Sequence, residues 1–280
     1  MKSLAILGPG LLGGSIALAA RRVGGWRVSL GARRAEAVAE IEARGIADAA
    51  STDLRSIVSG ADLVILCVPI GAMPALAREI ADAISPQTIV TDVGSVKAGV
   101  VLELGAIFRE RGRFVGSHPM AGSEQTGIGA ARAELFEGAA CIVTPDASSD
   151  AAAVADVRVF WQSLGSRVLE VLPAEHDEIV ALVSHLPHLL AATLVQTVLA
   201  ENPRAFEFSG PGFRDTTRVA AGPPAMWAEI LRTNRAAVRK SAEAMIEKLH
   251  EIMTLLDREP PMTEFLTQAK EQRDRLQPLK

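Results

Sequence analysis

Cysteine is scarce in this chain, with two residues among 280, Cys67 and Cys141. Two thiols cannot form a disulfide framework, and neither lies in a metal-binding motif. Both are flanked by apolar residues that favour strands. We therefore expect two buried thiols in a protein of the reducing cytoplasm.

Concentrated charge and long apolar runs are also missing. The net charge is −4 and no basic cluster occurs, which argues against a nucleic-acid partner. Four glycines interrupt the uncharged stretch 3–20, so a strand-to-helix turn explains it better than a signal peptide. No other run is apolar and long enough to cross a membrane, so we expect no membrane partner.

The N-terminal stretch instead has the pattern of a nucleotide-binding turn. An apolar strand pattern at 4–7 is followed by GPGLLGGS. In it, Gly8, Gly10 and Gly13 satisfy the spacing G-x-G-x-x-G, which permits a tight turn, the approach of a pyrophosphate and close helix packing. The helix that follows would direct its N-terminal N–H groups at the phosphates. With a second strand at 26–30, the pattern predicts a dinucleotide cofactor.

No carboxylate stands at the end of the second strand, where an enzyme using NAD usually places one for the ribose 2′-hydroxyl. The sequence there is Gly31-Ala32-Arg33-Arg34. Guanidinium groups can hold a 2′-phosphate through charge-assisted hydrogen bonds. We therefore predict NADP as the preferred cofactor, with NAD possible. The alternative is that both arginines are the solvated start of a helix, with Glu36 one turn away.

Strand and helix patterns alternate as far as residue 172. Such alternation is typical of an α/β Rossmann-type doubly wound sheet, in which ligands bind beyond the carboxyl ends of the strands. Gly8, Pro69, Ser95 and His118 each follow a predicted strand, so we expect one crevice to hold all four. The later strands are predicted at 62–68, 89–93, 114–116, 140–143 and 168–171. The predicted cofactor contacts are Gly8, Gly10, Leu11, Leu12, Gly13, Arg33, Arg34, Val68, Pro69 and Ser95.

Strand patterns stop after Leu172, and helix-forming residues predominate from there. We divide the chain into a dinucleotide-binding domain, 1–172, and an all-α domain, 173–280. Apolar helix surfaces of this extent usually pack against one another or against a second subunit, so we expect a homodimer. Helices are predicted at 173–200, about 224–256 and 261–275, with an irregular stretch at 208–224.

Two histidines share a face of the first long helix, in the segment SHLPH. His185 and His188 are three residues apart, and Pro187 should bend the helix between them. No metal is expected, because no Cys or acidic side chain accompanies the pair at ligand spacing. In the irregular stretch, Arg214 and Arg218 suit a carboxylate ligand, although a surface ion pair with the neighbouring aspartate explains them equally well.

Taken together, these motifs resemble the prephenate/arogenate dehydrogenase family of tyrosine biosynthesis. They occur in the family's order, and SHPMAG followed by SHLPH is far more specific than the glycine pattern. The length leaves no room for a mutase or regulatory domain, so the chain resembles the minimal form. The matching stretches are GPGLLGGS (8–15), LCVPI (66–70), DVGSVK (92–97), GSHPMAGSEQTG (116–127), EHD…SHLPH (175–188) and GFRDTTRVA (212–220).

The resemblance implies a Rossmann domain, a helical dimerisation domain and an oxidative decarboxylation. The substrate would be prephenate, giving 4-hydroxyphenylpyruvate, or arogenate, giving tyrosine. His118 would accept the proton of the ring hydroxyl as hydride leaves the same carbon, with an imidazole pKa near its normal value. Ser95 would orient that imidazole or the hydroxyl. The implied substrate-binding residues are His188, Arg218, Glu124, Ser123 and His185, with Glu124 as a gating acid near the arginine.

Three alternatives stay open on the sequence alone. Prephenate is favoured over arogenate, because the presence of both His188 and Glu124 resembles the prephenate-using members. A two-domain β-hydroxyacid dehydrogenase usually works with a lysine in its second domain, and 173–200 contains none. A non-catalytic NADP-binding sensor would not need Ser95, His118 and His188 together.

Overall fold

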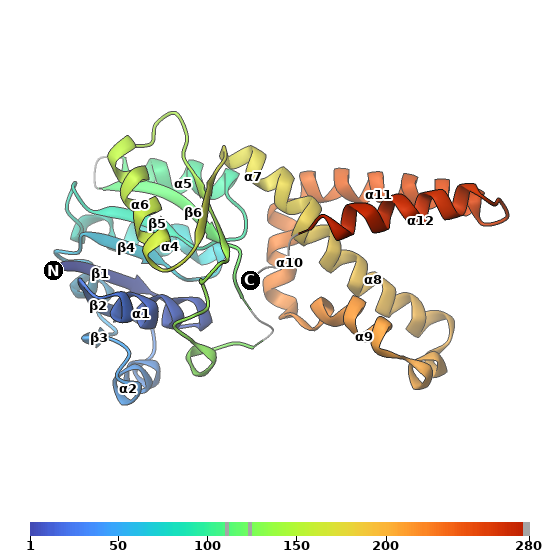
Figure 1. Cartoon of the computed structure of the whole chain (residues 1–280). Coiled ribbons are helices and arrows are strands. Elements are labelled where there is room, and N and C mark those ends of the chain that lie inside the picture. Colours follow the sequence, from blue (N-terminus) through green and yellow to red (C-terminus); the bar gives the residue numbers. More distant parts are fainter. Residues whose placement is uncertain (110–111, 123–124, 277–280) are drawn as a thin grey trace.

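The computed structural model describes residues 1–109, 112–122 and 125–276. Two parts of the chain lie side by side, a sheet flanked by helices and a purely helical part from which the long helices project (Figure 1). The substrate-binding residues predicted at Ser123 and Glu124 lie outside the described residues.

The first part contains an eight-stranded sheet with the strand order β3-β2-β1-β4-β5-β6-β7-β8. Neighbouring strands run parallel except β6 and β7, which are antiparallel. The carboxyl ends of β1, β4, β5 and β6 therefore lie along one edge. The strands are β1 (Lys2–Leu7), β2 (Trp26–Gly31), β3 (Ala49–Ser51), β4 (Leu63–Leu66), β5 (Ile89–Asp92), β6 (Arg113–Pro119), β7 (Ala140–Thr144) and β8 (Arg167–Glu170).

Both faces of the sheet are buried under helices, which confirms the doubly wound fold. In β1, Leu4 and Ile6 enter one apolar cluster while Ala5 and Leu7 enter the other, because successive side chains point to opposite faces. The first face packs on α1 (Leu11–Val23), α2 (Ala35–Arg44) and α6 (Ala151–Ser163). The second packs on α3 (Leu54–Val58), α4 (Met73–Ile80) and α5 (Ala98–Phe108). Short 3-10 turns are η1 (Ile70–Ala72), η2 (Ala81–Ala83) and η3 (Ile128–Ala130).

The helical part begins at Pro173, and two residues separate it from the end of β8. In Figure 1 the helices α11 and α12 project together away from the sheet, and α8 diverges from them. Its elements are α7 (Pro173–Val180), η4 (Ala181–His185), α8 (Leu186–Glu201), η5 (Pro203–Phe208), α9 (Pro211–Thr217), η6 (Arg218–Ala221), α10 (Pro224–Thr233), α11 (Arg235–Leu255) and α12 (Pro261–Asp274).

The irregularity predicted from Pro187 takes the form of a π-helical turn. The segment η4 separates α7 from α8, and the Leu186 N–H bonds to the Ala181 carbonyl, five residues earlier. Proline has no N–H to donate, so the regular ladder cannot continue unchanged through this turn.

Two of the predicted helix boundaries are wrong. The stretch 208–224 is not irregular, because α9 and η6 occupy most of it, with Pro211 in the first turn of α9. The single helix predicted at about 224–256 is two helices, α10 and α11. They are separated by Asn234, whose φ of −97° and ψ of 26° leave the helical region.

One helix conflicts with the expectation that no run is fit to cross a membrane. The helix from Pro173 to Glu201, counted through η4, is long and apolar enough by length and composition. Its first turns, however, carry buried polar side chains that hydrogen-bond to α5 and to Asn234. Such contacts are those of a helix packed against protein.

Candidate active site

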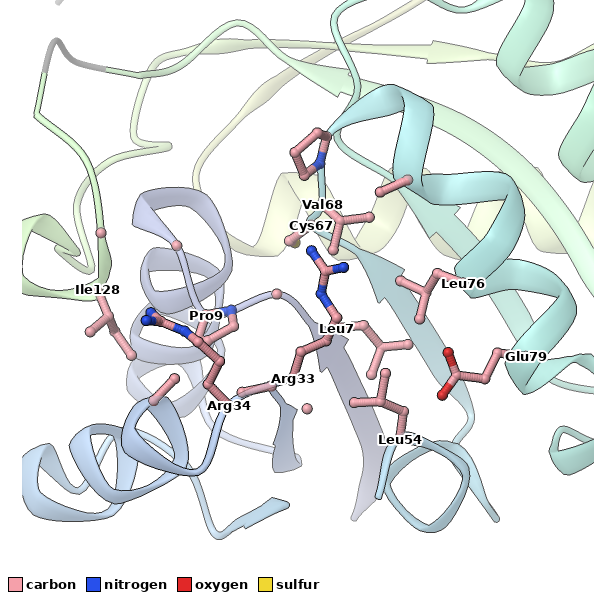
Figure 2. Close-up of a pocket in the computed structure, with 18 of the residues that line it drawn as sticks. Leu7, Pro9, Arg33, Arg34, Leu54, Cys67, Val68, Leu76, Glu79 and Ile128 are labelled. Atoms are coloured by element: carbon pink, nitrogen blue, oxygen red, sulfur yellow. The ribbon is translucent and has the colours of Figure 1, made fainter. Parts of the chain in front are cut away.

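A cavity of about 890 Å³ lies at the carboxyl ends of β1, β2 and β4 (Figure 2). Six of the predicted cofactor contacts line it, while Leu11, Leu12, Gly13 and Ser95 do not. The expected shared crevice therefore contains Gly8 and Pro69 but neither Ser95 nor His118. The predicted residues in its lining are Gly8, Gly10, Arg33, Arg34, Val68 and Pro69.

The three glycines of the turn have the separate geometries that a dinucleotide site requires. Gly8 has φ +113°, and a Cβ there would lie 2.3 Å from the Cys67 carbonyl oxygen. A Cβ on Gly13 would lie 2.0 Å from the Gly8 carbonyl oxygen, so the helix packs tightly on the turn. A Cβ on Gly10 would meet nothing within 4 Å. Gly10, which immediately precedes α1, thus leaves open space for a pyrophosphate, and the site fits the cofactor.

Two arginines line this cavity. Both side chains are exposed, and Arg34 occupies the position before the first turn of α2. Figure 2 shows Arg33 reaching toward Val68, whereas Arg34 turns toward Pro9 and Ile128. Two carboxylates, Glu40 and Glu79, also line the cavity, farther along their helices. The end of β2 itself carries no acid, as the sequence indicated.

His118 lies inside a strand, which corrects its predicted place just after the end of one. It is the penultimate residue of β6 and is only 7% exposed. Beside β5, the strand pairs only as far as Val115. From Gly116 to Pro119 it pairs with the antiparallel β7, and this second ladder carries β6 onward through His118.

The ring of His118 is held by two residues that sequence reasoning did not identify as site residues. His118 Nδ1 lies 2.9 Å from His176 Nε2, and His176 Nδ1 lies 2.8 Å from Asp177 Oδ1. The Asp177 carboxylate accepts the Lys97 N–H at 2.7 Å and the Ala98 N–H at 2.9 Å. These two amides form the amino end of α5. The segment EHD, which contains both residues, was part of the family resemblance and was the available signal.

A buried lysine supports the strand just before His118. Lys97 Nζ forms an ion pair with Asp92 and donates to the Ser117 carbonyl at 2.9 Å. The Ser117 hydroxyl donates to the Asp92 carbonyl at 2.6 Å, and the Trp161 indole N–H donates to that hydroxyl oxygen at 3.0 Å. Burial lowers the pKa of Lys97, while Asp92 opposes that shift. These bonds fix the end of β6 relative to β5 and α6.

The two histidines of SHLPH are both buried, and Trp227 lies beside them. The His188 ring stacks on Trp227, with 3.6 Å between ring centroids and 9° between planes. His185 Nδ1 lies 3.1 Å from Asn234 Nδ2, which also donates to the Asp177 carbonyl at 2.8 Å. Asn234, at the break between α10 and α11, and Trp227 were not predicted as site residues. Only the unexpected helix break brings Asn234 to this position.

Burial sets the protonation of the histidines. It holds the pKa of His118 well below 6.5, with smaller effects in the same direction from His176, Lys97 and His185. The imidazole is therefore neutral near pH 7, and its pKa is not near the normal value that the sequence analysis expected. Burial also lowers the pKa of His185 to about 4, although Asp177 opposes this shift. At neutral pH both rings are hydrogen-bonding groups without charge.

The remaining predicted residues are less tightly placed. Ser95 follows β5 and is half-buried, and no described residue hydrogen-bonds to its side chain. Arg218 begins η6 and is exposed. The main-chain carbonyl of the next residue, Val219, accepts a hydrogen bond from the His188 ring, so Arg218 lies close to that stacked ring.

Comparisons with known proteins agree along almost the whole chain. Residues 16–170 match the family model for the nucleotide-binding domain of prephenate dehydrogenase, and 172–271 match that for its dimerization domain. A prephenate dehydrogenase of Bacillus subtilis is 35% identical over 98% of this chain and 76% of the relative. A cyclohexadienyl dehydrogenase of Zymomonas mobilis is 35% identical over 91% of this chain and 88% of the relative.

Solved structures give the same result. A prephenate dehydrogenase from Aquifex aeolicus, in complex with hydroxyphenyl propionate and NAD+, has a TM-score of 0.92 at 32% identity, covering 99% of each chain. A Synechocystis arogenate dehydrogenase has a TM-score of 0.86 at 30% identity, covering 97% of this chain and 99% of that one. A 3-hydroxyisobutyrate dehydrogenase from Salmonella typhimurium, with a TM-score of 0.61 at 16% identity, shares the fold alone.

Proposed function

Because the chain belongs to the prephenate dehydrogenase family, we propose that it oxidatively decarboxylates prephenate to 4-hydroxyphenylpyruvate. It is a dehydrogenase with a nucleotide-binding domain for a nicotinamide dinucleotide. The observation that carries the proposal is the neutral, buried His118. It lies at the sheet edge that also carries the glycine turn.

In this reaction, His118 acts as the general base. Its imidazole accepts the proton of the ring hydroxyl as hydride leaves the carbon that bears this hydroxyl. A bound nicotinamide would accept the hydride. The resulting ketone is an electron sink for the electron pair released when the ring carboxylate leaves as carbon dioxide. Aromatisation of the ring makes the overall reaction favourable. Burial keeps the imidazole neutral, so its lone pair is available to a proton near pH 7, although the lowered pKa also makes it a weaker base.

We assign the remaining roles by position. Ser95, beyond the end of β5, orients the substrate hydroxyl or the imidazole. His188 and His185 contact the substrate, and Arg218 binds one of its carboxylates through charge-assisted hydrogen bonds. Trp227 holds the His188 ring in plane. For Ser123 and Glu124 we keep the substrate-binding role that the family resemblance implies.

The proposal is tested by measuring how much reduced nicotinamide cofactor forms with prephenate, with arogenate and with each of a panel of hydroxyacids. Turnover of prephenate is expected. Exclusive turnover of arogenate would select the alternative, which the similarity to a Synechocystis arogenate dehydrogenase keeps open. Turnover of a hydroxyacid alone, or of nothing, would indicate the β-hydroxyacid enzyme or the NADP-binding sensor.

The role of His118 is tested by replacing it with asparagine. His118→Asn is expected to lower kcat by about 10²–10⁴, the usual contribution of a positioned base, with little change in KM. His250→Asn is the matched control, since His250 is exposed on α11. Near-normal kcat for His118→Asn would remove it from the mechanism.

For the cofactor, we propose a preference for NADP over NAD. Arg33 and Arg34 line the cavity and the end of β2 has no acid, so a 2′-phosphate would gain charge-assisted bonds and meet no repulsion from that strand end. The ratio of kcat/KM for the two cofactors measures the preference. A ratio in favour of NAD, the cofactor bound by the Aquifex relative, would contradict it.

We also propose a cytoplasmic homodimer that joins through the helical domain, with the domains divided between 172 and 173. Apolar side chains are exposed along α8, α11 and α12 of one chain, which suits an interface between copies. Sedimentation at micromolar concentration is expected to give a dimer, and a monomer would contradict the proposal. The exposed residues are Leu194, Leu199, Ile246, Leu249, Met253 and Leu266.

A further inference from the structure

We propose that His176 and Asp177 are positioning residues that fix His118 in the tautomer protonated on Nδ1. Nε2 of His118 is then left with its lone pair for the substrate hydroxyl. The inference rests on the proposed role of His118 as the base and specifies which nitrogen accepts the proton. It follows from the direction in which each hydrogen bond of the chain must run.

The direction is set at Asp177. Its two carboxylate oxygens accept main-chain N–H groups, from Lys97 at 2.7 Å and from Ala98 at 2.9 Å. A main-chain amide can only donate, so both oxygens act as acceptors in these bonds. The amino end of α5 also favours negative charge at this place. Asp177 is therefore a carboxylate and accepts from the third neighbour, His176 Nδ1.

His176 then has only one arrangement of protons. Its Nδ1 carries the hydrogen that Asp177 accepts at 2.8 Å. The side chain is fully buried, and burial lowers its pKa, although Asp177 opposes the shift. The ring is therefore neutral near pH 7, and Nε2 has a lone pair. That nitrogen accepts a hydrogen bond from His118 Nδ1, 2.9 Å away.

His118 is the last residue in this chain of hydrogen bonds. A hydrogen on Nδ1 of a neutral imidazole leaves Nε2 without one. The opposite tautomer would set two lone pairs against each other at 2.9 Å, between two buried rings. No described residue hydrogen-bonds to His118 Nε2, so this nitrogen remains for a ligand. Two residues from α7 thereby determine the chemistry of a side chain on β6.

Conformation as well as tautomer is fixed by the same contacts. The planes of the His118 and His176 rings lie at 64°, with centroids 5.1 Å apart, so rotation of either ring would break the bond. Asp177 is anchored on its other side by Asn234, which donates to its main-chain carbonyl. The surrounding charged and titratable groups are Lys97, Asp92 and His185.

The tautomer can be observed directly in the full-length protein labelled with 15N-histidine. Imidazole 15N shifts distinguish protonated from unprotonated nitrogens, and the spectrum of His118→Asn identifies the His118 signals. In the wild-type protein we expect His118 to be protonated on Nδ1 and unprotonated on Nε2. Protonation on Nε2 would overturn the proposal, whether or not the protein is active.

Two substitutions at His176 test the consequence for turnover. His176→Leu removes the acceptor, so we expect a mixture of His118 tautomers and a loss of about 10² in kcat with little change in the KM for the cofactor. His176→Gln can place its amide oxygen near the former Nε2, so it should restore the Nδ1–H tautomer and most of kcat. Unchanged tautomer and kcat in a folded His176→Leu protein would overturn the proposal.

The controls separate this inference from the proposed function. His250 on α11 is exposed in the single chain and takes no part in the hydrogen bonds between Asp177 and His118, so His250→Leu should change neither the His118 signals nor kcat. If His176→Leu fails to fold, His176→Gln still decides the question, because Nε2 protonation of its His118 would contradict the proposal. Wild-type protein that shows the expected tautomer but turns over neither prephenate nor arogenate would contradict the proposed function alone.

Discussion

At the scale of single residues, the glycines of the first turn have different roles although they share one motif. Gly13 and Gly8 are required by the chain itself, because a side chain at either would overlap main-chain atoms at 2.0 to 2.3 Å. Gly10 is required by nothing in the chain, since a Cβ there meets no atom within 4 Å. The space beside Gly10 is therefore space for a ligand.

This difference predicts opposite outcomes for two alanine substitutions. Gly10→Ala should leave Tm unchanged and raise the KM for the cofactor about tenfold, which corresponds to 1.4 kcal/mol. Gly13→Ala should lower Tm, because α1 must move away from the Gly8 carbonyl. Thermal unfolding and steady-state kinetics measure both effects.

Gly99→Ala on α5 is the matched control, since its Cβ would also meet nothing within 4 Å but lies outside the cofactor cavity. It should change neither the KM nor the fold. An unchanged KM in Gly10→Ala would show that the cofactor does not approach this turn.

At the scale of elements, the sequence predicted the strands and helices that repeat a strong pattern and missed those defined by distant contacts. The apolar runs of β1 and β4 were visible because both faces of a parallel strand are buried. The end of β6 was placed too early, since its last residues pair with β7, more than 20 residues later. No local pattern encodes that pairing.

The break between α10 and α11 shows the same limitation. Asn234 is flanked by good helix formers, so the sequence favours a continuous helix. Its side chain instead bonds to His185 and to the Asp177 carbonyl. The polar contacts of a buried amide therefore override local propensity. His118 and His188 could be found from motifs, whereas His176 needed the three-dimensional partner to give it a role.

Removing this amide should affect both stability and catalysis. Asn234→Ala leaves the buried His185 Nδ1 without a donor and removes one donor from the Asp177 carbonyl, which keeps the Ala181 N–H. We therefore expect a loss of about 1–3 kcal/mol in the free energy of unfolding. Since Asp177 is also loosened, kcat should fall as well. Urea unfolding and kinetics on the same preparation measure the two effects.

Asn202→Ala is the control, because Asn202 caps an exposed turn with one main-chain bond. It should cost clearly less stability and leave kcat unchanged. Equal losses in the two variants would mean that the helix break is not held by buried hydrogen bonds.

At the scale of the whole molecule, the neutral histidines between the two domains make the fold sensitive to acid. Burial lowers the pKa of His185 to about 4, whereas an unfolded histidine takes up a proton near 6.5. Between these values the unfolded chain binds the extra proton, so acid favours unfolding. The pKa values of His118 and His176 are lowered too, chiefly by burial, and act in the same direction.

We therefore expect the contribution of these histidines to the free energy of unfolding to be complete above pH 6.5 and to fall as the pH drops below that value. Each buried histidine contributes a slope of about 1.4 kcal/mol per pH unit. Urea titrations at a series of pH values measure the slope. The slope should be smaller in His185→Leu by the contribution of about one proton, and it should be unchanged in His250→Leu. Equal slopes in all three proteins would contradict this explanation.

The bond between Asp177 and the amino end of α5 has a consequence for building chimeras of related enzymes. A natural place to exchange modules is the junction at 172/173, where the sheet ends. An exchange there would pair the His118 of one parent with the His176 and Asp177 of the other. A hybrid joined after α7 keeps all three from a single parent, so we expect it to tolerate recombination better. The residues that position the catalytic base therefore extend beyond the nucleotide-binding domain into α7, and they should be exchanged together.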